Sequence, residues 1–357
     1  MKKYQVLEDY FDKSYRIENY PTLAQQRKLW SKTRPFEGLN ILDATPLCRN
    51  SIYKYMNLIY AGANLSIGQN PFASTTNEML ALIKASNIPL VSRNSEPQGF
   101  DIVMDCAAQF INFPSRLGRV ELTRSGAEIY KSKNEKVFMA DAGTIKMIET
   151  CIGTGESYFR AMDALGYNDW TDRKLALFGC GKVGQGILKA ANERGIKVIL
   201  ISDSSLLKEK HKAMADKVID FRNRDEVADA TLSCYAMVTA VGVKGAIEKT
   251  ISPDKLITSN LLLANMGAED EYGESFSAER ILAKKDSLNF ILEDPTELQY
   301  IDATLTLHNL GAEYLLNNKM AQGIIIPPTH MEQELLNQTL EYGNISSKLC
   351  ELLESNK

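Results

Sequence analysis

The sequence lacks the residues from which metal centres, disulfide frameworks and hydrolase triads are usually built. Its 357 residues include three histidines, and its six cysteines are scattered singly with no C-x-x-C pair. Neither a zinc site nor any other metal centre is therefore expected, and the cysteines are expected to be small buried residues in a reducing compartment. No G-x-S-x-G elbow accompanies the histidines, which argues against a serine hydrolase.

Long apolar runs and an excess of positive charge are missing as well. No run approaches the roughly 18–20 apolar residues that span a bilayer, and Lys2 and Lys3 are not followed by the apolar stretch of a secretory signal. Lysine and arginine total 41 against 45 aspartates and glutamates, which gives a formal net charge of −4. We therefore expect a cytoplasmic protein that binds neither a membrane nor nucleic acid.

The sequence does contain the alternation of apolar runs and amphipathic stretches that is typical of an α/β protein. Helices are expected at 51–63, 77–87, 144–165 and 186–195, and over most of 308–357. Strands separated by such helices predict parallel sheets covered on both faces. The expected strands lie at 40–47, 64–68, 88–94, 99–110 and 136–143, and again at 174–179, 197–202, 217–221, 236–242 and 255–267.

These two series of strands predict two doubly wound parallel-sheet domains, one inserted into the other. A polar stretch at 166–174 separates the two series, and a largely helical tail follows the second one. At roughly 150 residues per domain, the chain has the length of two domains. We expect a discontinuous substrate domain at 1–151 and 306–357, with a Rossmann dinucleotide-binding domain at 152–305.

The clearest motif is a glycine-rich turn, G-C-G-K-V-G, that follows an apolar strand. Gly179 permits the tight turn, Gly181 lets the backbone approach a pyrophosphate, and Gly184 lets the next helix pack on the strand. The helix begins at the turn, so the backbone at Lys182 and Val183 would present N–H groups to phosphates. We interpret this turn as a dinucleotide site, the alternative being a glycine-tolerant turn that binds nothing.

Asp203 bears on the choice between the two nicotinamide cofactors. It ends the next predicted strand, where a carboxylate accepts hydrogen bonds from the adenosine ribose and would repel a 2′-phosphate. NAD is therefore the expected cofactor. NADP stays open, because neighbouring side chains could donate hydrogen bonds to a phosphate, namely Ser202, Ser204, Ser205 and Lys208.

On these and further motifs, the chain resembles the S-adenosylhomocysteine hydrolase family over about residues 40–345. The segment F-G-C-G-K-V-G-Q-G is similar to the glycine loop of the family, and I-G-T-G-E-S-Y-F-R-A-M, at 152–162, to the segment that leads into its linker helix. N-P-F-A-S-T-T-N-E, at 70–78, is similar to its Ser-Thr-Gln-Asp region. The resemblance implies tightly held NAD in a domain inserted into a substrate domain, and a homodimer or homotetramer.

The resemblance also implies which residues meet the nicotinamide half of NAD. V-T-A-V-G at 238–242 and N-M-G at 265–267 are similar to the strand ends that lie beside the nicotinamide in the family. Cofactor contacts are therefore implied at Thr239, Val241, Gly242 and Asn265.

The residues that carry out the chemistry of the family are absent from this chain. No histidine stands near Pro46, Cys106 replaces the second Asp of the Asp-Asp-Gly-Gly strand, Ile145 stands at the lysine position, and Ala268 replaces a second histidine. The family oxidises a ribose 3′-hydroxyl with NAD, and this step needs proton-transfer groups beside the nicotinamide. We therefore expect no hydrolysis of S-adenosylhomocysteine.

Other polar residues remain as catalytic candidates. Asp105 ends a predicted strand, where ligands sit in open α/β sheets, although it could equally cap a helix. Glu121 keeps one acid of the family's Glu-Glu-Thr-Thr-Thr run. Lys146 and Glu149 would share a helix face at i and i+3, either as functional groups or as a surface salt bridge. Further candidates are Asp141, Asp302 and His308, the last of which is expected to begin a helix as a packed or capping residue.

Three functions remain open from the sequence. The favoured one is an NAD-dependent enzyme that performs oxidoreductase-type chemistry, or hydrolysis or elimination with transient oxidation, on a different small hydroxy- or amino-bearing substrate. The second is a non-catalytic relative that senses NAD or binds a partner. A 2-hydroxy-acid dehydrogenase has less support, because Glu297 and His308 have no clear arginine partner in that family's order.

Overall fold

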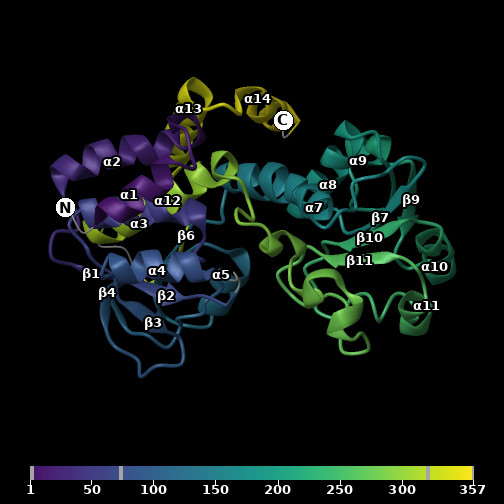
Figure 1. The fold of residues 1–357 in the computed structure, drawn as a ribbon, viewed down its shortest axis with the longest axis horizontal. Helices are drawn as coiled ribbons and strands as arrows, with labels where there is room; N and C mark the ends of the chain where they lie inside the picture. Colours follow the sequence, from purple (N-terminus) through teal and green to yellow (C-terminus); the bar gives the residue numbers. More distant parts are fainter. Residues whose placement is uncertain (1–3, 72–74, 319–321, 356–357) are drawn as a thin grey trace. The chain divides into compact units, whose positions relative to one another are not determined.

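The computed structural model describes residues 4–71, 75–318 and 322–355, and its chain forms two compact units (Figure 1). Unit 1 consists of Met1–Ile148 and Glu297–Lys357, and unit 2 is the intervening Glu149–Thr296. The second boundary therefore lies between Thr296 and Glu297 rather than at 305–306, because one continuous helix begins at Leu298 and belongs entirely to unit 1.

Unit 1 is built on a seven-stranded parallel sheet in the order β12-β6-β5-β4-β1-β2-β3. The chain winds outward in both directions from β1 and β4, which are neighbours in the sheet. This is the doubly wound topology expected from the sequence. The strands are β1 (Asn40–Asp43), β2 (Asn64–Gln69), β3 (Leu90–Ser92), β4 (Phe100–Asp105), β5 (Ser115–Glu121), β6 (Lys136–Met139) and β12 (Gly323–Ile325).

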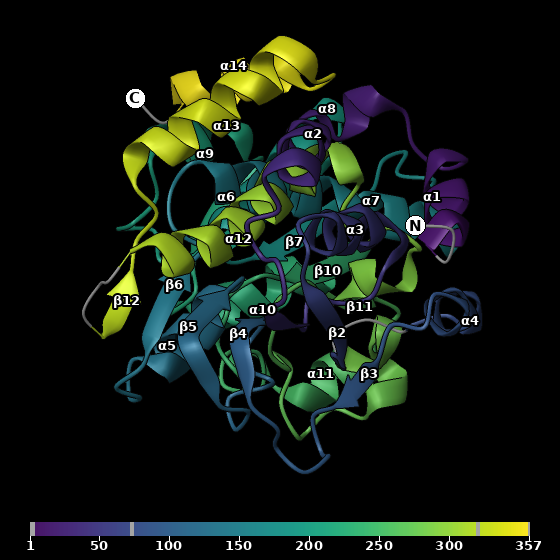
Figure 2. The same ribbon diagram turned by 90° about the vertical axis from the view of Figure 1, so that its left-hand side faces the viewer.

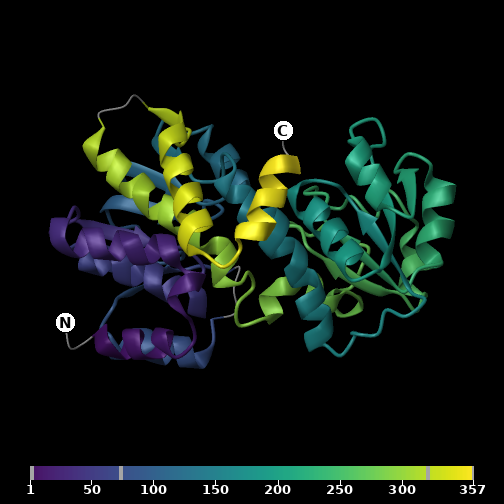
Figure 3. The same ribbon diagram turned by 90° about the horizontal axis from the view of Figure 1, so that it is seen from above.

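The helices of unit 1 pack on its sheet and on one another (Figure 2). Helix α12 (Leu298–Asn317) contacts β4, β5 and β6, and it packs against α2 (Pro21–Thr33) and α3 (Ile52–Tyr60). The helices near the C-terminus, α13 (Thr329–Tyr342) and α14 (Ser346–Ser355), follow each other in yellow in Figure 3, with α13 packed on α12 and α2. The shorter helices are α1 (Gln5–Asp12), α4 (Asn77–Ala85), α5 (Arg124–Tyr130) and α6 (Ile145–Met147).

Unit 2 contains a five-stranded parallel sheet in the order β11-β10-β7-β8-β9. Its elements are α7 (Thr154–Ala164), β7 (Lys174–Phe178), α8 (Lys182–Glu193), β8 (Lys197–Ser202), α9 (Glu209–Met214), β9 (Lys217–Asp220), α10 (Arg224–Leu232), β10 (Ala236–Thr239), α11 (Pro253–Ile257) and β11 (Leu262–Asn265). The fold is thus α/β with two parallel sheets, as the sequence predicts.

The strands of unit 2 are apolar on both faces because helices cover both faces. Leu175 and Leu177 of β7 join a core with residues of α7 and α8. The alternate residues, Ala176 and Phe178, join a second core with residues of α10 and α11. This alternation explains why the strands appear as continuous apolar runs in the sequence.

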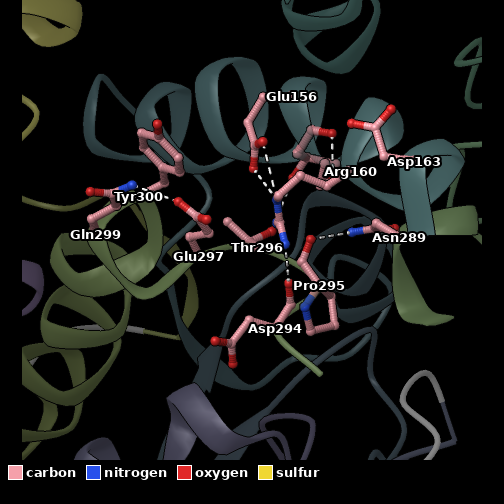
Figure 4. Close-up of polar contacts among 12 residues, drawn as sticks. Glu156, Arg160, Asp163, Asn289, Asp294, Pro295, Thr296, Glu297, Gln299 and Tyr300 are labelled. Carbon is pink, nitrogen blue, oxygen red and sulfur yellow. Dashed lines mark hydrogen bonds and ion pairs between the residues drawn. The ribbon is translucent and has the colours of Figure 1, made fainter. Parts of the chain in front are cut away.

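Polar contacts within unit 2 bring its first and last residues together (Figure 4). Thr154, at the start of α7, lies 3.4 Å from Thr296 between the two hydroxyl oxygens. Arg160, also in α7, donates to Glu156 over 2.8 Å and to the carbonyl oxygen of Asp294 over 3.1 Å. Asn289 donates to the carbonyl oxygen of Pro295 over 3.1 Å. An inserted unit needs its two ends close together, and these contacts hold them there.

Several elements differ from the sequence-based expectation. The stretch 144–165 is helical from Ile145 to Ala164, as expected, but its middle, Ile148–Gly153, is a π-helix between α6 and α7. The expected strand at 255–267 begins instead as helix α11, and only its last part forms β11. Strand β5 was not anticipated, because arginines and a glycine interrupt its apolar pattern; Arg119 is buried there and donates to the carbonyl oxygens of Phe110 and Phe113.

Within residues 4–71, 75–318 and 322–355, no helix is both long and apolar enough to cross a membrane. The same residues contain no group of three or more His, Cys, Asp or Glu side chains arranged to hold a metal ion.

Candidate functional site

The glycine-rich turn of unit 2 joins β7 to α8, and two of its glycines are required by the protein's own packing. Gly179 has a φ of +93°, and a Cβ there would lie 2.4 Å from the carbonyl oxygen of Ala240. A Cβ on Gly184 would lie 2.2 Å from the carbonyl oxygen of Gly179. Neither position can accept a side chain without moving backbone, because contacts this short are strongly repulsive.

Gly181 differs from both neighbouring glycines. It is the N-cap of α8, its φ of −69° is open to any L-residue, and a Cβ there would meet no heavy atom of the described chain within 4 Å. The protein's own packing therefore does not require a glycine here. A glycine at this point keeps space free directly above the N-terminus of α8.

The N-terminus of α8 offers hydrogen-bond donors beside that space. The first N–H groups of a helix have no intrahelical acceptor, and α8 begins at Lys182, Val183 and Gly184. The N-cap Gly181 has no side chain to accept from them. Together with the positive end of the helix dipole, these donors suit a phosphate group.

Asp203 follows β8 and is held in place by its neighbours. Its carboxylate accepts from the backbone N–H and the hydroxyl of Ser205, over 3.1 and 2.6 Å. It also pairs with Arg222 across 2.5 Å. The Ser205 hydroxyl and then Arg222 lower the pKa of Asp203, so the side chain is ionised at neutral pH.

On the other side of β7, the sequence-implied residues form a hydrogen-bonded group at the ends of β10 and β11. The Thr239 hydroxyl donates to the side-chain oxygen of Asn265 over 3.1 Å. The amide of Asn265 in turn donates to the carbonyl oxygens of Glu269 and Lys285, over 2.7 and 2.8 Å. Thr239 and Asn265 thus contact each other directly, and both are buried.

Glu271 is a residue of this group that the sequence analysis missed. Its carboxylate accepts from the backbone N–H groups of Val241 and Gly242, over 2.9 and 2.5 Å. Gly267 makes room for it, because a Cβ there would lie 1.9 Å from a Glu271 oxygen. Burial raises the pKa of Glu271. Its place in an acidic loop, with no apolar pattern around it, gave no sign that it turns inward.

In unit 1, Asp105 lies at the end of β4 and is fully buried. Its carboxylate accepts from the backbone N–H groups of Cys106 and Phe110, over 2.8 and 3.0 Å, and from the Tyr130 hydroxyl over 2.5 Å. Burial raises its pKa. The side chain therefore fixes the turn after β4 and the position of α5.

Glu121 lies opposite Asp105 in the register of β4 and β5 and has a similar role. It accepts from the backbone N–H groups of Ala107, Ala108 and Thr123, over 2.8, 3.1 and 2.8 Å. Both alanines have positive φ, 58° and 52°, a backbone conformation that residues other than glycine rarely adopt. Burial, followed by the charge of Asp105, raises the pKa of Glu121 to about 7.

Lys146 belongs to unit 1 and lies close to the same sheet edge. Its ammonium donates to the carbonyl oxygen of Leu122 over 3.0 Å and lies 4.0 Å from the Asp141 carboxylate. Both side chains are nearly buried, 5% and 7% exposed. Glu149 falls in the π-helix that begins unit 2. The regular i, i+3 helix face expected for Lys146 and Glu149 is therefore not formed.

A buried ion pair in unit 1 also escaped the sequence analysis. Lys54 of α3 pairs with Asp43 at the end of β1, and both side chains are completely buried. His308 lies near this pair, in the interior of α12 rather than at its start, and its Nε2 is 3.1 Å from the carbonyl oxygen of Val120. Burial, and then the charge of Lys54, lowers the pKa of His308 to about 3. The histidine is therefore a neutral, packed residue.

Asp302, the remaining candidate, caps a helix. Its carboxylate accepts from the backbone N–H groups of Thr22 and Leu23, over 2.9 and 3.0 Å, at the first turn of α2. The Thr22 hydroxyl donates to it over 2.7 Å. Burial raises its pKa to about 7. These contacts assign Asp302 to the packing of α12 against α2.

No protein-family model matches the chain, and no curated protein does so either. Among solved structures, it is similar to a dipicolinate synthase subunit from Bacillus halodurans, with 12% identity, a TM-score of 0.48, and 79% of this chain and 100% of that chain covered. It is also similar to D-lactate dehydrogenase with NAD⁺ from Lactobacillus jensenii, with 12% identity, a TM-score of 0.35, and coverage of 66% and 73%.

A third similar structure is an NADPH-dependent glyoxylate/hydroxypyruvate reductase from Sinorhizobium meliloti in complex with NADP and sulfate. It has 12% identity and a TM-score of 0.31, with 64% of this chain and 72% of that chain covered. Likenesses this distant carry no argument about function, which must come from the residues of the chain itself.

Proposed function

We propose that unit 2 binds NAD at residues 179–184 and that the protein is an NAD-dependent oxidoreductase acting on a small hydroxy- or amino-bearing substrate. The observation that carries the proposal is Gly181. The packing of the protein accounts for Gly179 and Gly184 but not for Gly181, which keeps space open at the N-terminus of α8. A pyrophosphate is the ligand that such a turn fits.

The other parts of the cofactor would meet residues on either side of that turn. Asp203 would accept hydrogen bonds from the adenosine ribose, since its carboxylate is ionised and held in place after β8. Thr239, Val241, Gly242 and Asn265 would lie towards the nicotinamide half, beside Glu271. The bound cofactor would supply hydride transfer, while these residues hold and orient it.

Oxidation of a hydroxyl or amine also needs a group that accepts a proton. In unit 1 we assign this part to the Asp141 carboxylate, with the Lys146 ammonium 4.0 Å away to orient it, because both side chains are nearly buried and Lys146 donates to the carbonyl oxygen of Leu122, directly after β5. Asp105 and Glu121 become positioning residues under this proposal. Glu149 keeps no assigned role.

We further propose that the chain is a divergent relative of the S-adenosylhomocysteine hydrolase family that does not cleave S-adenosylhomocysteine. Cys106, Ile145 and Ala268 stand where the family has reactive residues. Losing one general acid or base typically costs about 10²–10⁴-fold in rate. A cytoplasmic homodimer or homotetramer is the assembly that this relationship favours.

A non-catalytic NAD sensor is the second candidate. Two carboxylates favour it. Asp105 and Glu121 are catalytic candidates from the sequence, but both accept hydrogen bonds from backbone N–H groups. A protein that kept the fold and the cofactor loop but lost the chemistry would have this arrangement.

The test of NAD binding uses the full-length protein and a matched pair of glycine variants. Nucleotide released from the purified protein is identified by mass spectrometry, and NAD⁺ affinity is then measured by calorimetry. Gly181→Leu should weaken binding by more than about 100-fold, because the side chain fills the phosphate space. Gly99→Leu is the control, since Gly99 is also exposed and has no neighbour within 4 Å in the described chain. Full affinity in Gly181→Leu would overturn the site.

Lys146→Ala separates the enzyme from the sensor. In an oxidoreductase it should leave the NAD⁺ affinity within about twofold while lowering turnover of the responsive substrate by about 10²-fold or more. The measurement is a screen of small hydroxy and amino compounds for reduction of bound NAD⁺, followed by fluorescence of the reduced cofactor. A wild-type protein that binds NAD⁺ but reduces it with none of these compounds would favour the sensor.

A further inference from the structure

We infer that Arg222 is a latent binding residue for the 2′-phosphate of NADP. Asp203 pairs with this arginine and thereby makes the protein select NAD. This inference rests on the proposed dinucleotide site and concerns the end of that site that would hold the adenosine ribose. Arg222 is distant from Asp203 in the sequence and follows β9, which neighbours β8 in the sheet.

Three charged side chains meet at the carboxyl ends of β8 and β9. One Arg222 nitrogen, Nη2, lies 2.5 Å from Asp203, and the other, Nη1, lies 3.1 Å from Asp220. The backbone N–H of Arg222 also donates to Asp220 over 3.0 Å. Arg222 is therefore anchored to Asp220 through backbone and side chain, and to Asp203 through its side chain alone.

Each carboxylate is in turn fixed by a serine of the turn after β8. Ser204 donates to Asp220 through its N–H and its hydroxyl, over 3.1 and 2.7 Å. Ser205 does the same to Asp203, over 3.1 and 2.6 Å. The Ser204 hydroxyl is the largest cause that lowers the pKa of Asp220 to about 2. Both acids are thus ionised, and the group carries two negative charges and one positive charge.

The Arg222 guanidinium group is accessible to a ligand, but it is already paired with Asp203. The Arg222 side chain is 58% exposed and that of Asp203 is 23% exposed. A 2′-phosphate dianion placed beside Asp203 would meet a carboxylate, while the arginine that would attract it is already engaged. A ribose diol, in contrast, can donate to the same carboxylate, so the group favours NAD as it stands.

Removing the Asp203 carboxylate should convert the group into a phosphate site. In Asp203→Ser, Asp220 would still hold Arg222 through the backbone N–H and Nη1, while Nη2 would be released. The N–H and hydroxyl of Ser205 would be released as well. An arginine fork next to a backbone N–H is a common way to bind a phosphate.

The experiment measures dissociation constants of NAD⁺ and NADP⁺ for four full-length proteins: wild type, Asp203→Ser, Arg222→Ala and the double variant. Asp203→Ser should raise NADP⁺ affinity by about 10- to 100-fold, the worth of one or more charge-assisted hydrogen bonds. Adding Arg222→Ala to Asp203→Ser should abolish most of that gain. In the wild-type background, Arg222→Ala should change NADP⁺ affinity by no more than about threefold, because the arginine is already paired.

The controls distinguish this inference from the proposal on which it rests. Arg224→Ala removes an exposed arginine of the same charge two positions away, and it should leave the nucleotide preference of Asp203→Ser unchanged. If NAD⁺ binds but Arg222→Ala has the same effect in both backgrounds, the latent site is wrong and the NAD site stands. A wild type that prefers NADP⁺ would also overturn the inference, and binding of neither nucleotide would remove both proposals.

Discussion

The carboxyl ends of β4 and β5 in unit 1 differ from those of β7 and β8 in unit 2. In unit 1, Asp105 and Glu121 end adjacent strands, are completely buried, and are saturated with hydrogen bonds from nearby turns. In unit 2, Asp203 follows β8 but remains partly exposed, and Gly181, which follows the neighbouring strand β7, keeps space open at the N-terminus of α8. The ends of β4 and β5 are filled by the protein's own side chains, whereas the ends of β7 and β8 leave space and charged groups accessible.

The difference shows that an acidic residue at the end of a parallel strand does not by itself identify a reactive group. The position is shared by Asp105 and Asp203, but the surroundings are not. A buried carboxylate that accepts backbone N–H groups stabilises a turn, because those donors would otherwise be unsatisfied. An exposed, preorganised carboxylate has capacity left to recognise a ligand.

The largest expected effect is a difference in stability between two variants, Asp105→Ala and Asp203→Ala. Asp105→Ala should lower the free energy of unfolding of unit 1 by about 4 kcal/mol, because the Phe110 N–H and the Tyr130 hydroxyl lose their buried acceptor. Asp203→Ala should leave the free energy of unfolding essentially unchanged, since its partners reach solvent. Urea denaturation measures both values.

The two tryptophans allow the effect to be assigned to one unit. Trp30 lies in α2 of unit 1 and Trp170 lies in unit 2. In a Trp170→Phe background, fluorescence therefore reports on unit 1 alone, and the Asp105→Ala shift should appear there. Equal losses in Asp105→Ala and Asp203→Ala would contradict the distinction between the two sheet edges.

A second pair of variants compares one glycine from each unit. A Cβ on Gly126 would lie 2.2 Å from the carboxylate carbon of Glu121, and that carboxylate is held by three backbone N–H groups. Gly126→Ala should therefore destabilise unit 1 by about 3 kcal/mol. Gly181→Ala should alter stability by no more than about 0.5 kcal/mol, because the added methyl meets nothing. Thermal denaturation with and without NAD⁺ tests both, and a stability loss in Gly181→Ala would show that packing requires this glycine after all.

The smallest expected effect concerns pH and the buried cap at Asp302. Burial raises its pKa to about 7, so the folded state keeps a proton that the unfolded chain releases near its ordinary pKa of about 4. Its contribution to stability is present at low pH and is lost as the pH rises through about 7. The difference in unfolding free energy between wild type and Asp302→Asn should therefore shift by about 2 kcal/mol between about pH 5 and about pH 8.

Comparing the two proteins at each pH cancels the opposite contribution of His308. Its pKa is lowered to about 3, so it destabilises the folded state as the pH falls below its ordinary value, and it does so equally in wild type and variant. A constant difference between wild type and Asp302→Asn across the pH range would show that Asp302 is ionised in the folded state.

Much of the fold could be predicted because its signals are local. The strand–glycine–helix pattern around Gly179 and Gly184 and the apolar runs of β7 and β8 depend on neighbours in the chain. Strand β5 could not be predicted, since the buried Arg119 is satisfied by carbonyl oxygens from another segment. The start of α12 at Leu298 was missed for a similar reason, as its polar Asp302 pairs with a distant helix.

The sequence by itself determined the α/β class, the two series of strands and the position of the glycine turn, because these follow from the period of apolar residues and from backbone conformations that only glycine adopts readily. The tertiary structure alone decided which polar residues remain available. It buried Asp105 and Glu121 under backbone donors, turned Glu271 inward, and placed Arg222 beside Asp203. Burial and hydrogen-bond partners come from segments far apart in the chain, and they, rather than residue type, set the pKa and the accessibility of each charged group.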